Sequence, residues 1–285
     1  MQLSTLSRDA ARSALHRIDA WGVALIVCSI ALLVHDAVTP RNLLLVLAVT
    51  AAYGLGYAVN DYFDSPFDAQ EAGKARHNFF VRHRLSPRRA RAVFAAAVAV
   101  PLGVFASFGV RGLLVAATCV LVIWAYSAPP LRLKSRPGLD LLTHALFVQT
   151  FAYFICVFLT GAGWLRADAW LLAINFLASL SGQLAQQVRD FDLDSRTDVN
   201  FATTVGLPAT ATCLQGTTLA VVVTGVAGFA VGALPLILAP LALGFGFAAA
   251  RRMRGGESLP SPAQIYLPTT LALAYTGVLV AAQLH

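Results

Sequence analysis

Apolar segments close to the length of a membrane-crossing helix recur along the whole chain, and they constrain its fold more than any other feature. A helix needs roughly 20 apolar residues to cross about 30 Å of hydrocarbon. Only 12% of the 285 residues are charged, whereas a soluble domain carries about 25%. The sequence therefore predicts an all-α, polytopic membrane helical bundle. We expect about nine spans, at residues 21–36, 43–59, 91–109, 112–128, 140–160, 169–188, 209–231, 233–250 and 265–283, with eight or ten also compatible.

The basic residues predict how these spans are oriented. Lys and Arg concentrate in the cytoplasmic loops of membrane proteins. With nine spans and a cytoplasmic N-terminus, 18 of the 21 basic residues lie on the cytoplasmic side, and only Arg41, Arg111 and Arg166 lie outside. Residues 1–20 then form an amphipathic lead-in on the cytoplasmic surface, without the features of a cleavable signal. The net charge of +7 reports topology, so we expect no nucleic-acid partner.

Acidic residues gather in two clusters that both fall on the predicted cytoplasmic side. On a helix, each cluster places three carboxylates within about 60–80° of arc, while Asp192 points away from its neighbours. Two facing rows of carboxylates repel one another unless a cation lies between them, and Mg²⁺ suits such a site because it leaves positions for phosphate oxygens. We call Asp61, Asp64 and Asp68 the first acidic row, and Asp190, Asp194 and Asp198 the second acidic row.

A simpler interpretation of these acids stays open at this point. An Asp-rich turn at the end of a span is ordinary in a membrane protein. Ser65 and Pro66 also form a good N-cap and first-turn pair, which would make Asp68 an acid at the start of a new helix. Two clusters at helical spacing, after equivalent spans and on one membrane face, favour a functional site over this alternative.

A basic stretch lies between the two acidic rows in sequence, on the same predicted face. Pro129 and Pro130 end the fourth span and are expected to hold the next residues extended, so that Arg132 and Lys134 point the same way. A pair of cations facing acid-bound metal would suit a diphosphate group. The alternative is that these residues only follow the excess of positive charge in cytoplasmic loops.

Three motifs in this chain resemble those of the UbiA superfamily of intramembrane prenyltransferases. N-D-Y-F-D-S-P-F-D, from Asn60 to Asp68, resembles the family's N-D-x-x-D-x-x-x-D motif. R-D-F-D-L-D-S-R-T-D, from Arg189 to Asp198, resembles its second D-x-x-x-D motif. Y-S-A-P-P-L-R-L-K, from Tyr126 to Lys134, is similar to the family's phrase at the end of its fourth helix. The resemblance covers nearly the whole chain, so we expect one domain over residues 1–285.

The resemblance implies a bundle around a central cavity that opens to the lipid bilayer. A prenyl diphosphate would bind with its head between the acidic rows through Mg²⁺ and its tail in the membrane. The implied metal ligands are the six residues of the two rows. The implied catalytic residues are Asn60, Asp61, Asp64, Asp190 and Asp194, and the implied substrate-binding residues are Lys74, Tyr126, Arg132, Lys134, Tyr153 and Arg189; Tyr53 and Tyr57 are further candidates to face a carbocation.

The implied activity is transfer of a prenyl group from a prenyl diphosphate to a lipophilic acceptor, terpenoid, carotenoid or aromatic. After the first motif, residues 74–84 lack the Arg-Pro segment common in members that act on quinone precursors, which favours a long terpenoid. A terpene cyclase of the same superfamily remains the alternative. A transporter is a third hypothesis, but nearly all the spans lack the mid-span charges that it would need. The expected location is the bacterial inner membrane, with the active-site loops in the cytoplasm.

Overall fold

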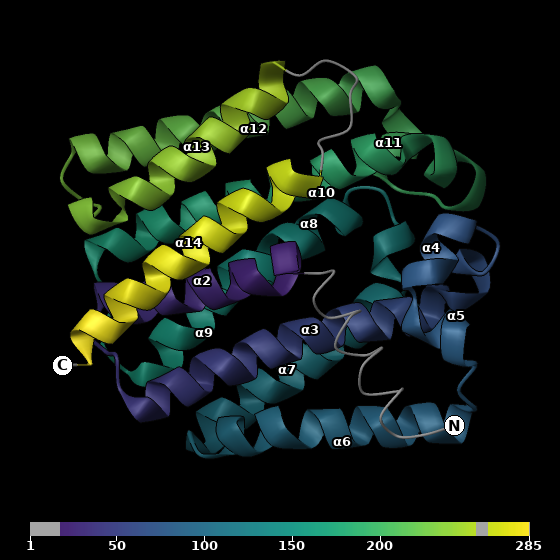
Figure 1. Ribbon diagram of the computed structural model, residues 1–285, viewed down its shortest axis with the longest axis horizontal. Coiled ribbons are helices and arrows are strands. Elements are labelled where there is room, and N and C mark those ends of the chain that lie inside the picture. The colour runs from purple at the N-terminus through teal and green to yellow at the C-terminus, as the bar shows by residue number, and fades with distance from the viewer. Residues whose placement is uncertain (1–17, 255–261, 285) are drawn as a thin grey trace.

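Long helices that lie side by side and alternate in direction form the bundle in Figure 1. The computed structural model describes residues 18–254 and 262–284, so the predicted lead-in falls almost wholly outside the described residues. The long helices are α2 (Ile18–Val34), α3 (Pro40–Asp68), α6 (Pro87–Ala106), α7 (Gly109–Ser127), α10 (Arg166–Thr197), α12 (Leu207–Ala230), α13 (Ala239–Arg254) and α14 (Pro262–Gln283), and the fifth predicted span is α8 (Leu139–Ala145), η2 (Leu146–Thr150) and α9 (Phe151–Thr160).

The outer surface of the bundle has the character of a lipid-facing surface. Five of the described helical segments are long and apolar enough to cross a membrane: Pro40–Asp68, Pro87–Ala106, Gly109–Ser127, Leu139–Thr160 and Leu207–Ala230. Large apolar side chains such as Val100, Leu236 and Leu243 are each more than 70% exposed, which is costly in water but not in hydrocarbon. The all-α membrane bundle predicted from the sequence is confirmed, while the count of nine spans stays a prediction.

The second and sixth predicted spans continue as helices through the acidic motifs. Helix α3 runs to Asp68 with Pro66 inside it, so the interpretation of Ser65 and Pro66 as a helix start is wrong. Proline has no backbone N–H, and its presence frees the carbonyl of Tyr62 four residues earlier. The hydroxyl of Ser65 donates to that carbonyl over 2.8 Å, which satisfies the acceptor that Pro66 leaves open.

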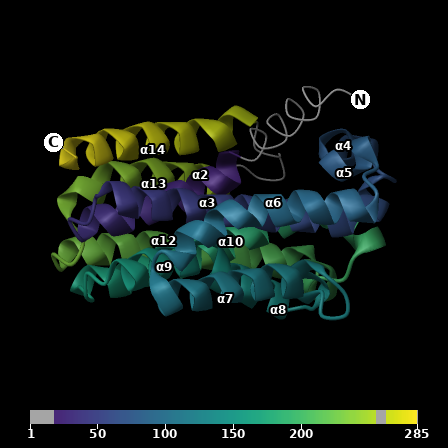
Figure 2. The same cartoon turned by 90° about the horizontal axis from the view of Figure 1, so that it is seen from below.

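Several short helices cover one end of the bundle, which we call the capped end. They are α4 (Ala72–His77), α5 (Phe79–His83), α11 (Phe201–Val205) and the 3₁₀ turn η1 (Leu133–Ser135). Figures 1 and 2 both place α4 and α5 at the end where α3 finishes and α6 begins. The ring of Phe80 packs at 5.3 Å from that of Tyr62 and 5.6 Å from that of Phe94, so aromatic contacts hold this cap on α3 and α6.

A π-helical turn interrupts the fifth predicted span. In η2, the hydroxyl of Thr150 donates to the carbonyl of Ala145 over 2.8 Å. The backbone N–H of Gln149 bonds the hydroxyl of Ser179 on α10 over 3.2 Å. Such a turn inserts one extra residue into a helix and is often found at functional sites. It lies against α10 directly beside the cavity described next.

Candidate active site

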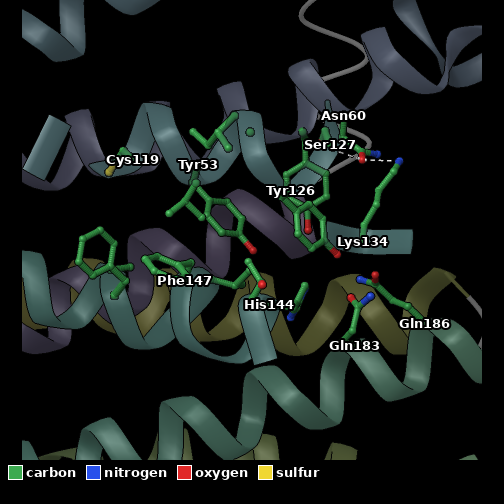
Figure 3. A pocket seen from close by; sticks show the side chains of 18 of the residues that line it. Tyr53, Asn60, Cys119, Tyr126, Ser127, Lys134, His144, Phe147, Gln183 and Gln186 are labelled. Atoms are coloured by element: carbon green, nitrogen blue, oxygen red, sulfur yellow. Dashed lines mark hydrogen bonds between the residues drawn. The ribbon is translucent and has the colours of Figure 1, made fainter. Parts of the chain in front are cut away.

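A cavity of about 290 Å³ opens between α3, α7, α8, α9 and α10. Figure 3 shows Tyr53 and Tyr126 on one wall of it, and His144, Gln183 and Gln186 on the other. Its deeper part is apolar, whereas charged residues lie at the capped end. The residues used below come from α3 (Tyr53, Tyr57, Asn60), α7 (Tyr126), η1 (Lys134), α8 and η2 (His144, Phe147), α9 (Phe151), α10 (Gln183, Gln186, Gln187, Asp190, Asp194) and the loop after it (Asp198, Asn200).

All three carboxylates of the second acidic row line this cavity. Asp190 and Asp194 lie on the last turns of α10, and Asp198 follows the final helical residue, with its backbone N–H bonded to the carbonyl of Asp194 over 2.8 Å. The side-chain amide of Asn200 donates to Asp194 Oδ2 over 2.9 Å. The row is therefore held in place by its own helix and by the loop that follows.

The electrostatics of Asp194 reflect this crowding. The residue lies beyond the predicted span 169–188, at the capped end of α10. Burial raises the pKa of its carboxyl, and the nearby charges of Asp190 and Asp198 raise it further. Lys74 and the hydrogen bond from Asn200 act in the opposite direction. A bound cation would stabilise this site, because it would reduce the repulsion between the neighbouring carboxylates.

The first acidic row is arranged differently, since none of its three carboxylates is among the residues that line the cavity. Asp61 is only 6% exposed. The side-chain amide of Asn78 donates over 2.8 Å both to the backbone carbonyl of Asp61 and to Asp68 Oδ2. Asp64 reaches the basic residues described next. Sequence reasoning missed Asn78, because its partners lie 10 and 17 residues earlier.

Arg132 and Lys134 lie between the two acidic rows. Arg132 Nη2 donates to Asp64 Oδ1 over 3.2 Å and lies 3.9 Å from Asp198 Oδ2, so it touches both rows. Lys134 Nζ donates to Asn60 Oδ1 over 2.8 Å and also to Asp64. Burial lowers the pKa of Lys134, and Asp64 partly offsets that shift. The two cations thus lie beside carboxylates that the sequence predicted as metal ligands.

The backbone of this basic segment differs from the expected extended form. Arg132 adopts a left-handed conformation with φ of 38°, and Leu133–Ser135 form a 3₁₀ turn. The expectation that Pro129 and Pro130 keep these residues extended is therefore wrong. A left-handed conformation costs a non-glycine residue on the order of 1 kcal/mol. The bond from Arg132 Nε to Ser135 Oγ, at 2.9 Å, helps to hold it.

The other predicted substrate-binding residues have diverse settings. Tyr126 lines the cavity. Arg189 forms a two-point contact with Asp190, at 3.0 and 3.1 Å, near the surface. Lys74 lies 4.0 Å from Glu71 and close enough to Asp194 to lower its pKa.

The substrate-binding role predicted for Tyr153 stays a prediction, and its surroundings in the structure are those of a packing residue. Its side chain is fully buried and is not among the residues that line the cavity. Its hydroxyl donates to Asp168 Oδ1 over 2.6 Å, and His35 Nε2 lies 2.9 Å from the same oxygen. These three side chains tie the turn that follows α2 to α9 and α10 at the end of the bundle opposite the capped end. The apolar run around Tyr153 gave no sign of this polar partner.

A buried network that the sequence did not reveal supports the second acidic row. Asp140 is fully buried, and its Oδ2 accepts from the amide of Gln187 over 2.6 Å and from the backbone N–H of Phe201 over 2.9 Å. Gln187 in turn accepts from the backbone N–H of Ala202 over 3.0 Å. The network anchors the loop that carries Asp198 and Asn200. The sequence signal that could have revealed this network is Asp140 itself, an acid at the very start of the predicted span 140–160.

The donor atoms at the mouth of the cavity suit Mg²⁺. In the part of the chain that the structure describes, no three Asp, Glu, His or Cys side chains converge into a metal-binding cluster. Mg²⁺ does not need one, since it binds through one or two carboxylates together with phosphate oxygens and water. Four carboxylates supply oxygen donors here. Asp64 and Asp198 both lie close to Arg132, and Asp190, Asp194 and Asp198 line the cavity.

This combination defines a class of protein: a polytopic helical membrane protein with an apolar cavity whose mouth carries both acidic and basic groups. The model of the UbiA prenyltransferase family matches residues 22–281. The chain therefore belongs to the UbiA prenyltransferase family. A search of curated proteins found no match.

Solved structures share the fold at low sequence identity. A UbiA homologue from Archaeoglobus fulgidus bound to GPP and Mg²⁺ is similar with a TM-score of 0.75 at 19% identity, over 94% of this chain and 98% of the homologue. The same homologue bound to DMAPP and Mg²⁺ gives 0.74 at 19% identity, with the same coverage. An apo UbiA homologue from Aeropyrum pernix K1 gives 0.68 at 19% identity, again over 94% and 98% of the two chains.

Proposed function

We propose that this protein is a Mg²⁺-dependent intramembrane prenyltransferase that moves a prenyl group from a prenyl diphosphate to a lipophilic acceptor. The observation that carries the proposal is the position of Arg132 and Lys134 between the two acidic rows, at the mouth of an apolar cavity. Fixed cations at this point suit a diphosphate, and the cavity behind them suits a prenyl chain.

The charged groups supply the means to hold the diphosphate head. Mg²⁺, when bound, would neutralise the charge that develops on the departing diphosphate. Asp64 on one side and Asp190 and Asp194 on the other are the residues that would hold it. Arg132 and Lys134 would turn from Asp64 towards the phosphate oxygens. Such preorganised cations stabilise the leaving group most when the carbon–oxygen bond breaks.

The aromatic wall of the cavity suits the other half of the reaction. Breaking an allylic carbon–oxygen bond leaves a carbocation, which ring faces stabilise by up to roughly 2 kcal/mol each without reacting with it. Five aromatic residues line the cavity: Tyr53, Tyr57, Tyr126, Phe147 and Phe151. The rings of Tyr53 and Tyr57 pack edge to face at 5.4 Å, which limits their freedom to rearrange around the cation.

The donor, the acceptor and the membrane orientation are supported by separate observations. Similar structures hold DMAPP or GPP together with Mg²⁺, which supports a prenyl diphosphate as donor. The apolar lining supports a lipophilic acceptor, and we favour a terpenoid. The surplus of basic residues in the loops at the capped end supports a site facing the cytoplasm of a bacterium.

Product analysis on the purified protein tests the proposal. The protein is incubated with Mg²⁺ and dimethylallyl, geranyl, farnesyl or geranylgeranyl diphosphate, with and without a lipid extract, and the products are identified by mass spectrometry. Metal-dependent products found only with extract, each heavier than an extract lipid by one prenyl unit, are expected. Asp64→Asn and Asp194→Asn should abolish them.

The same experiment separates the alternatives. Hydrocarbon or terpene alcohol formed without extract, and lost in both variants, would identify a terpene cyclase instead. No release of diphosphate from any donor would contradict both enzymatic functions and favour a transporter.

A further inference from the structure

A histidine lies on the cavity wall away from the acidic rows. His144, on the last turn of α8, is the one histidine among the described residues that line the cavity. Figure 3 shows it on the wall opposite Tyr53 and Tyr126. Neither the metal nor the diphosphate needs an imidazole there. Its place beside the apolar part of the cavity therefore calls for a separate explanation.

The hydrogen bonding of His144 fixes its tautomer. Its Nδ1 lies 3.2 Å from the backbone carbonyl oxygen of Ser179 on α10. A carbonyl oxygen only accepts, so Nδ1 carries the proton, and in the neutral ring Nε2 keeps a free lone pair. Among the described residues Nε2 has no hydrogen-bond partner. The two ring nitrogens point in widely different directions. Because Nδ1 faces α10 and the residue lines the cavity, we infer that the lone pair of Nε2 faces the cavity.

The π-helical turn holds the imidazole in this position. η2 begins two residues after His144, and its Gln149 N–H bonds the hydroxyl of the same Ser179 over 3.2 Å. Ser179 is fully buried. One residue of α10 thus fixes both the ring of His144 and the irregular turn beside it. A group held this way keeps its orientation while substrates enter and leave.

We propose that Nε2 of His144 is the base that removes the last proton of the reaction, an assignment that rests on the proposed function. The carbon–oxygen bond of the donor breaks, and diphosphate leaves with the electron pair. The π electrons of an acceptor alkene form the new carbon–carbon bond and leave a tertiary carbocation. A neighbouring carbon–hydrogen bond then gives its electrons to a new double bond, and its proton goes to Nε2. The imidazolium returns that proton to the departing diphosphate or to water.

The other side chains of the cavity are poorer bases for this step. Asp190 and Asp194 lie at the charged mouth, where Arg189 and Asn200 already bond them. Gln183 and Gln186 are amides without a basic nitrogen, and the tyrosine hydroxyls are weak bases when protonated. A neutral imidazole can accept a proton without a buried negative charge in the resting site.

The substitution His144→Asn tests the assignment. The amide of asparagine can replace Nδ1 as donor to the carbonyl of Ser179, but it offers no base in place of Nε2. The protein is incubated in liposomes with Mg²⁺, lipid extract and each of the four prenyl diphosphates in turn. Diphosphate release measures bond breaking, and the ratio of alkene products to alcohols measures what becomes of the cation. His35→Asn is the matched control, because His35 is buried with Asp168 outside the cavity.

We expect His144→Asn to lower the ratio of alkene to alcohol at least roughly tenfold, in line with the loss of a general base, while diphosphate release falls much less. His35→Asn should leave the ratio unchanged. If the wild type releases diphosphate and His144→Asn leaves the ratio of alkene to alcohol unchanged, the assignment of the base is overturned. The proposed function would still stand. An equal change of the ratio in both variants would also overturn the assignment, since a general loss of order would then suffice. No diphosphate release by the wild type would overturn the proposed function itself.

Discussion

The two acidic rows have similar helical spacing but different surroundings. All three carboxylates of the second row line the cavity. In the first row Asp64 contacts the basic pair, Asp61 is buried and Asp68 is bonded by Asn78. The second row therefore presents its acids to the cavity, whereas in the first row Asp64 faces the basic pair and Asp68 is held by Asn78. Similar motifs need not have similar roles.

The chain that follows each row accounts for the difference. After α3 the chain folds back at once as α4 and α5, which brings Asn78 against Asp61 and Asp68. After α10 the chain passes through Asn200 into α11, anchored on the buried Asp140. The segment after α3 covers the first acidic row, whereas the segment after α10 leaves the second acidic row open to the cavity.

The largest expected effect comes from Asp64, because it joins the basic pair to the first row. Asp64→Asn removes a charge from Arg132 and Lys134 together with an oxygen donor for Mg²⁺. We expect the rate of Mg²⁺-dependent product formation to fall by roughly 10³-fold, comparable to the loss of a strong electrostatic group. Asp68→Asn on the same row is the control and should lose far less activity. Equal losses in the two variants would contradict the division of roles within the first row.

Lys134 should follow with a somewhat smaller effect. Lys134→Met keeps most of the side-chain volume but removes the cation that bonds Asn60 and Asp64. We expect kcat/KM for the prenyl diphosphate to fall by roughly 10²-fold, with little change in thermal stability, since Asp64 keeps Arg132 as a partner. Steady-state kinetics over a range of donor concentrations would measure it. A variant with normal donor kinetics would show that Lys134 serves only to neutralise Asp64.

Local patterns made most of the fold predictable. The apolar runs placed the helices because each helix forms its own backbone hydrogen bonds, so length and composition suffice. The spacing of Asp190 and Asp194 likewise indicated one helical face. The same reasoning could not decide whether Pro66 starts or interrupts a helix, because the answer depended on a hydrogen bond from Ser65.

Features that depend on distant contacts were not predictable. Asn78 holds the first row across 10 and 17 residues, and His144 meets Ser179 across 35. Tyr153 seemed suited to the cavity by residue type, but the direction of its side chain was set by Asp168, 15 residues later. Polar residues within apolar spans, such as Gln183, Gln186 and His144, are the sequence signal that could have located the cavity.

The role of Asn78 can be tested by Asn78→Ala, for which we expect a moderate effect. The substitution frees Asp68 and the N-terminus of α5, whose Phe80 and Val81 N–H groups bond Asn78 Oδ1. Leaving buried groups without partners costs about 1–3 kcal/mol. Thermal unfolding in detergent should show the lower stability. Activity, measured separately as product formation, should fall roughly tenfold because the cap over the first row loosens. Unchanged stability would mean that the aromatic contacts of Phe80 hold the cap alone.

The smallest effect is expected at Asp192, which lies within the second acidic motif but outside the row. It is exposed on α10, whereas Asp190 and Asp194 on either side line the cavity. Asp192→Asn should change stability by no more than about 0.5 kcal/mol, as is usual for surface positions, and should leave product formation near the wild-type rate. Asp190→Asn is the matched comparison two residues away, and it should impair activity strongly. Because the two substitutions remove the same charge from the same helix, a difference between them isolates the direction of the side chain. Equal effects would mean that the total charge of this segment, and not the geometry of the row, determines activity.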